Sequence, residues 1–121
     1  MIPLVFHPIY SQLDLPYRHR FPIEKYQGIY AALIAQGVNK TDFYTPEPLD
    51  PIKLSQVYDH TYINELCSGK LDPKAMRRIG FPWSEQLIQR TLTAAGGTVL
   101  TAQLALEHGK ALNLTGGYHH A

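Results

Sequence analysis

The stretch IPLVF at residues 2–6 decides the fold that we expect, because it is a short apolar run that ends at His7-Pro8. Its β-branched and aromatic side chains suit a buried strand near the centre of a sheet. A weaker strand signal follows at residues 42–44, and another at residues 111–114 leads into the terminal loop. Strands that alternate with helical segments predict an α/β layered fold with a parallel sheet.

Helices are expected in the segments between these strands. After Pro22, apolar side chains recur at helical spacing as far as Gly37, which predicts a helix that covers one face of the sheet. Short helices are predicted after three further start signals, because an aspartate followed by proline or by a polar residue has N-cap chemistry. These signals are Asp50-Pro51, Asp59-His60 and Asp72-Pro73.

Ser84 begins the longest periodic stretch, which ends near His108-Gly109 and predicts one long helix or two abutting halves around Gly96-Gly97. The glycine pair either kinks this helix or permits close packing. Since glycine inside a helix costs about 1 kcal/mol relative to alanine, we expect a nearby group to use the space that the pair leaves.

The overall composition bounds the class of protein. A chain of 121 residues has the size of one domain, and 45% apolar with 17% charged residues is ordinary globular composition. A net charge of +1 argues against nucleic acid or an anionic membrane surface as a partner. The lone Cys67 permits no internal disulfide, and residues 1–6 lack the features of a signal peptide. We therefore expect a cytoplasmic protein with no nucleic-acid partner and no membrane association.

Two loops that follow predicted strands are candidates for a site, since ligands of α/β folds bind beyond the carboxyl ends of the strands. One loop spans residues 7–22, and the other ends the sequence as GGYHHA at residues 116–121. Histidine has the side-chain pKa nearest neutrality, and glycine lets main chain approach a substrate closely. The pair His119-His120 is thus typical of the acid/base half of an active site.

The ending GGYHHA, preceded by Asn113 and by AGGT at residues 95–98, resembles the histone deacetylase superfamily. This superfamily includes bacterial acetoin-utilisation and acetylpolyamine deacetylases. Further segments agree in family order: HRFP at residues 19–22, Tyr62-Ile63, and RRIGFPWS at residues 77–84. The resemblance spans essentially the whole chain. It implies that residues 1–121 form the N-terminal portion of a single catalytic domain with an arginase-like three-layer α/β fold.

The resemblance also implies an activity, the hydrolysis of an acetyl amide on a lysine or polyamine nitrogen with Zn²⁺ as cofactor. In that reaction His120 would be the general base that later protonates the leaving amine, and His119 its electrostatic partner. Gly117 would line the substrate channel and accept from the substrate amide N–H. The other candidate substrate-binding residues are Tyr118, His7, Tyr10 and His19.

The sequence departs from the family pattern after Ala121, since the family's zinc ligands and oxyanion-stabilising tyrosine lie downstream of the histidine pair. We therefore expect no metal ligand in this chain, Zn²⁺ only in the complete domain, and no catalysis by the isolated chain. The alternative is a non-catalytic truncated interaction module. A half sheet would expose strand edges and apolar faces that favour self-association or a complementary C-terminal fragment.

Individual residues also have alternative interpretations. Capping or packing roles are equally compatible with the sequence at His7, Tyr10 and His19. A metal site made of His7, His19, His119 and His120 has no carboxylate or thiol spacing to support it, and neighbouring loop histidines rarely face one ion.

Overall fold

The computed structural model describes residues 1–17, 19–117 and 119. Within them lies a parallel sheet of three strands, β1 (Leu4–Val5), β2 (Phe43–Tyr44) and β3 (Leu112–Asn113), in the order β2-β1-β3. Leu4 of β1 is in register with Phe43 on one side and with Leu112 on the other. The predictions of an α/β fold, a parallel sheet and a central first strand are confirmed.

The helices begin and end close to the predicted positions. Asp50 and Asp59 cap their helices by accepting from the backbone N–H groups of Ile52 and Thr61. Gly69 ends a helix in the left-handed conformation at a φ of 75°, which glycine adopts without strain. The helices are α1 (Lys25–Ala35), α2 (Pro51–Leu54), α3 (His60–Ser68), α4 (Pro73–Ile79) and α5 (Glu85–His108), with 3-10 turns η1 (Pro8–Ser11) and η2 (Lys40–Asp42).

The segment 7–22, expected to be a loop, begins with the 3-10 turn η1, so that part of the expectation was wrong. The cause is local capping, because His7 Nδ1 accepts from the backbone N–H of Ile9 at 3.0 Å and Pro8 occupies the first turn position. Tyr10 in this turn is fully buried.

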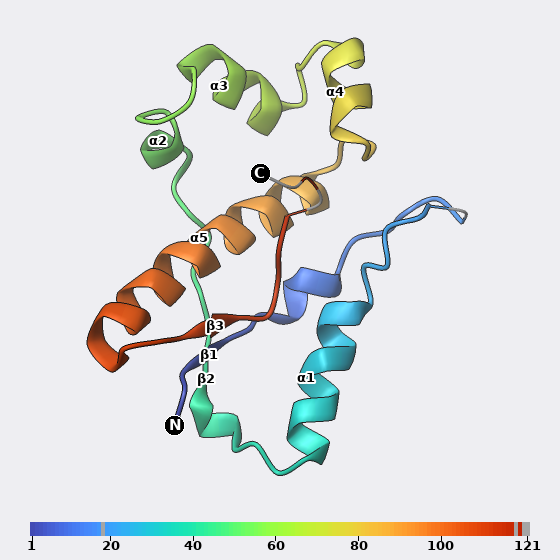
Figure 1. The fold of residues 1–121 in the computed structure, drawn as a ribbon. Coiled ribbons are helices and arrows are strands. Elements are labelled where there is room, and N and C mark those ends of the chain that lie inside the picture. The colour runs from blue at the N-terminus through green and yellow to red at the C-terminus, as the bar shows by residue number, and fades with distance from the viewer. Residues whose placement is uncertain (18, 118, 120–121) are drawn as a thin grey trace.

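The sheet separates the two longest helices, because neighbouring residues of a strand point to opposite faces. Phe6, directly after β1, stacks on Tyr30 of α1 with ring centroids 4.2 Å apart. On the other face Asn113, in register with Val5, lies against Gly97 of α5. Figure 1 shows α5 lying between the sheet and helices α2, α3 and α4.

Helix α5 is continuous through Gly96-Gly97 and is capped by Ser84, whose side chain accepts from the N–H of Leu87. A Cβ at Gly97 would overlap the Tyr10 hydroxyl, and a Cβ at Gly96 would overlap the carbonyl oxygen of Glu47. The expectation that neighbouring groups use this space is confirmed. The pair permits close packing on two sides of one uninterrupted helix.

Candidate functional site

The carboxyl ends of β1 and β3 lead into the two candidate loops, as predicted. The backbone N–H of Leu114 donates to the carbonyl of Val5 at 2.9 Å, which extends the sheet bonding just past β3. From there residues 115–117 cross over α5 (Figure 1). The terminal loop thus lies against the N-terminal half of the longest helix.

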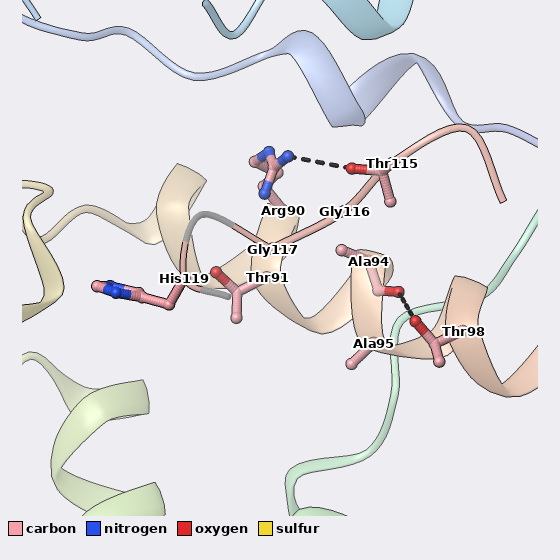
Figure 2. Close-up of a pocket in the computed structure, with 9 residues that line it drawn as sticks. All are labelled: Arg90, Thr91, Ala94, Ala95, Thr98, Thr115, Gly116, Gly117 and His119. Carbon is pink, nitrogen blue, oxygen red and sulfur yellow. Dashed lines mark hydrogen bonds between the residues drawn. The ribbon is translucent and has the colours of Figure 1, made fainter. Parts of the chain in front are cut away.

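A cavity of about 320 Å³ lies between this loop and α5. Figure 2 shows the terminal loop forming one wall and successive turns of α5 forming the other. The α5 wall combines small apolar side chains with hydroxyl groups, and the Thr98 hydroxyl donates to the carbonyl of Ala94 at 3.3 Å. The lining residues are Arg90, Thr91, Ala94, Ala95, Thr98, Thr115, Gly116, Gly117 and His119.

The two glycines of the loop leave the main chain open on the cavity side. A Cβ at Gly116 would meet no atom within 4 Å, and one at Gly117 would make only an ordinary contact at 3.7 Å. Close packing within the described part of the chain therefore does not demand glycine at these two positions, in contrast to Gly96 and Gly97. Both glycines line the cavity.

Three polar residues, Tyr10, Arg90 and Asn113, form a hydrogen-bonded group that we call the central network and that extends from the cavity wall at Arg90 into the core. Tyr10 and Arg90 are buried, and Asn113 is half-buried. The Tyr10 hydroxyl donates to Asn113 Oδ1 at 3.0 Å, and Arg90 Nε donates to the Tyr10 carbonyl at 2.9 Å. Burial raises the pKa of Tyr10 to about 12, although the charge of Arg90 and the Asn113 hydrogen bond oppose the shift. The phenol therefore stays neutral at physiological pH.

Arg90 was missed by the sequence reasoning, although the sequence contains a signal for it. The residue occupies the stripe of α5 that runs at helical spacing through Leu87 and Gly97, which are buried, and Ala94, which is half-buried. Only 1% of Arg90 is exposed. A charged residue within an apolar stripe must find polar partners in the folded chain, so its position alone indicates a buried network.

The structure separates the predicted site residues into two groups. Gly117 and His119 both line the cavity, and His119 Nε2 lies 3.3 Å from the carbonyl oxygen of Ile79. His7 caps η1, while Tyr10 is enclosed by the core behind the cavity wall. Tyr118 and His120 lie outside the described residues.

His19, from the loop 7–22, contacts the C-terminal end of α4, as His119 does. Its Nδ1 accepts from the N–H of Phe21 at 3.2 Å, which leaves Nε2 to donate to the carbonyl of Gly80 at 2.8 Å. The ring stacks on Phe81 with centroids 4.8 Å apart. His119 and His19 therefore contact the consecutive carbonyl groups of Ile79 and Gly80, whereas His7 caps η1.

Over residues 1–17, 19–117 and 119, no group of three His, Cys, Asp or Glu side chains is arranged to hold a metal ion. His7, His19 and His119 consequently do not form a shared site. Over the same residues, no helix is long and apolar enough to cross a bilayer.

Comparison with known proteins adds two relatives. No protein-family model matches the chain. An uncharacterized protein of Picosynechococcus sp. is 49% identical over 120 residues, which cover 98% of this chain and 40% of that protein. Histone deacetylase 2 of Arabidopsis thaliana is 27% identical over 117 residues, which cover 84% of this chain and 28% of that protein. The chain thus spans less than half the length of either relative, and its similarity to a histone deacetylase is distant.

Proposed function

We propose that this chain is the N-terminal portion of a histone-deacetylase-like catalytic domain, which in its complete form hydrolyses acetyl amides of lysine or polyamine nitrogens. The observation that carries the proposal is the placement of the terminal motif. Gly116, Gly117 and His119 follow a parallel strand and line a cavity of about 320 Å³, at the sheet edge where α/β folds bind ligands. The distant similarity to a plant histone deacetylase supports the same family.

In this proposal the chain contributes proton transfer and one wall of the substrate site. His120 accepts a proton from the attacking water and returns it to the leaving nitrogen, and His119 stabilises the charge that develops in this pair. The open main chain at Gly117 accepts from the substrate amide N–H. Acid/base groups of this kind contribute about 10²–10⁴-fold to a rate.

We propose that a Zn²⁺ ion is held only in the complete domain and that the isolated chain is inactive. The remaining parts of the proposal are an arginase-like arrangement of the complete fold, a cytoplasmic location, and contributions to substrate contact from Tyr118, His7 and His19. Tyr10, which is fully buried, would support the site from within the core.

A chimera tests this proposal directly. Residues 1–121 would replace the matched segment of the longer Picosynechococcus relative, and turnover of acetyl-lysine and acetylputrescine substrates would be measured with added Zn²⁺. We expect turnover by the chimera and none by the isolated chain. His120→Ala in the chimera should lower kcat at least about 100-fold.

His108→Ala is the matched control, because His108 is an exposed histidine at the far end of α5. It should leave kcat unchanged. A folded, zinc-loaded chimera without activity on either substrate, or equal losses in both histidine variants, would contradict the proposed function.

The second candidate is a non-catalytic interaction module, favoured by one feature of the sheet. In the described part of the chain β3 pairs only with β1, and Leu112 on β3 is 53% exposed. Open strand edges with apolar side chains favour self-association or pairing with a complementary fragment. Light scattering over a concentration series tests this: the interaction module predicts a mass above 13.7 kDa that rises with concentration, and a constant monomer mass would contradict it.

A further inference from the structure

Arg90 is the largest side chain of α5 that is almost fully buried, and its charge makes this burial costly unless polar partners compensate for it. Its partners come from three separate parts of the chain. Nε donates to the Tyr10 carbonyl in η1 at 2.9 Å, and Nη2 donates to the Thr115 hydroxyl in the terminal loop at 3.2 Å. The guanidinium carbon also lies 5.3 Å from the ring centre of Tyr26 in α1.

Tyr26 completes a link to the terminal loop. Its hydroxyl donates to the carbonyl of Gly116 at 3.5 Å, while its ring lies against the Arg90 guanidinium. The hydrogen bonds of the sheet extend as far as Leu114, whose N–H donates to the carbonyl of Val5. The next contacts along the chain are those of Thr115 with Arg90 and of Gly116 with Tyr26, and they come directly before Gly117.

We propose that Arg90 is a positioning residue, whose guanidinium holds Thr115 directly and Gly116 through Tyr26, and so fixes the main chain that brings Gly117 and His119 to the cavity. Figure 2 shows the Arg90–Thr115 hydrogen bond at the point where the loop crosses α5. This role in the conformation of the loop is independent of the reaction. Its consequence for catalysis rests on the proposed function.

The geometry requires arginine at this position. The planar guanidinium directs donors toward Tyr10 and Thr115 at once, while its central carbon lies over the aromatic ring of Tyr26. A lysine ammonium keeps the charge but cannot reproduce this fork and stacking face. Arg90→Lys should therefore release the loop without removing the positive charge.

Amide signals in NMR spectra of the ¹⁵N-labelled full chain provide the test. In Arg90→Lys we expect the Gly116 and Gly117 amides to move toward the shifts of an unstructured chain, and hydrogen exchange at Leu114 to rise on the order of tenfold. The amides of Gly37 and Gly69, which are remote from this contact, should stay in place. Arg78→Lys, an exchange at an exposed arginine of α4, is the matched control and should change none of these signals.

Thr115→Val is the second variant, because it removes the acceptor of Arg90 and keeps the shape of the side chain. It should move the same two glycine signals in the same direction by a smaller amount, and it decides the outcome if Arg90→Lys fails to fold. Unchanged Gly116 and Gly117 signals would overturn the proposal. A uniform shift of all glycine signals in both variants would also overturn it, because Arg90 would then only support the fold.

The catalytic consequence is measured in the chimera with the longer relative. Thr115→Val there should lower kcat about tenfold while the pH profile stays the same, since no titrating group is removed. If the unsubstituted chimera is active and Thr115→Val leaves its kcat unchanged, the catalytic consequence of the Arg90–Thr115 contact is contradicted. If the parent chimera is itself inactive, the proposed function fails, while the glycine signals still decide whether Arg90 positions the loop.

Discussion

The central network and the outer helices α2, α3 and α4 are stabilised in different ways. In the central network Tyr10 and Arg90 are at most 1% exposed, and their polar groups bond to one another and to Asn113. In α2 and α4, all of whose residues are described, no side chain is buried. Among the apolar residues of this outer region, Ile52 is 72% exposed and Val57 is 80% exposed.

This difference separates the part of the molecule that shapes the cavity from the part that surrounds it. In the centre, the Tyr10 hydroxyl and the Glu47 backbone approach α5 so closely that only glycine fits at Gly97 and Gly96. The outer helices are held by few contacts, such as the hydrogen bond from Trp83 Nε1 to the Leu66 carbonyl at 2.7 Å. We therefore expect substitutions to be costly in the centre and nearly neutral outside it.

The largest effect is expected from Gly97→Ala. The added methyl group would occupy the position of the Tyr10 hydroxyl, so Tyr10 must move and its hydrogen bond to Asn113 is lost. Overpacking and a lost buried hydrogen bond together should lower the free energy of unfolding by about 3 kcal/mol. Urea denaturation followed by circular dichroism measures the change.

Gly28→Ala in α1 is the matched control for this substitution. It also places a methyl group within a helix, but no atom lies within 4 Å of the new Cβ. Because alanine is the better helix former, the free energy of unfolding should rise by about 0.5–1 kcal/mol. Equal losses in the two variants would show that close packing at Gly97 is not the cause.

The next effect concerns pH. The pKa of Tyr10 is raised from 10.0 to about 12 in the folded chain, so between these values the unfolded chain loses the phenol proton while the folded chain keeps it. The Tyr10 contribution to stability is thus fully present below pH 10 and is lost as the pH rises toward 12. The difference in free energy of unfolding between the unsubstituted chain and Tyr10→Phe should fall by about 2–3 kcal/mol over this interval. A constant difference would contradict the buried, neutral phenol.

At pH 7 the same Tyr10→Phe substitution should have a smaller effect. It leaves the ring in the core and removes only the hydroxyl that donates to Asn113 Oδ1. The lost hydrogen bond should lower the free energy of unfolding by about 1–1.5 kcal/mol. Thermal denaturation measures it, and an increase in stability would show that this bond does not contribute to the central network.

Local signals explain which parts of the fold were predictable from the sequence. Asp50, Asp59 and Ser84 cap the helices that they were expected to begin. The glycine pair in α5 indicated close packing, although its partners Tyr10 and Glu47 come from distant segments. Such distant partners depend on the tertiary fold, and no local pattern specifies them.

The candidate site was predictable to a smaller extent. The terminal motif indicated that Gly117 and His119 face a site, and both line the cavity. Histidines have several competing roles, and His7 and His19 have local hydrogen bonds that their sequence positions did not specify. Arg90 stood out only as a charge in an apolar stripe, because its contacts lie 80 and 25 residues away along the chain.

The smallest effect is expected from Val57→Ser, next to the short helix α2. Val57 is 80% exposed, so the change should alter the free energy of unfolding by less than about 0.5 kcal/mol. Ile63→Val in α3, where Ile63 is only 3% exposed, is the matched comparison within the outer helices and should cost about 1 kcal/mol. Denaturation at two protein concentrations measures both. If Val57→Ser costs as much as Ile63→Val and the loss grows with concentration, another copy of the chain covers this surface, and the contrast between centre and outer helices does not hold for the associated state.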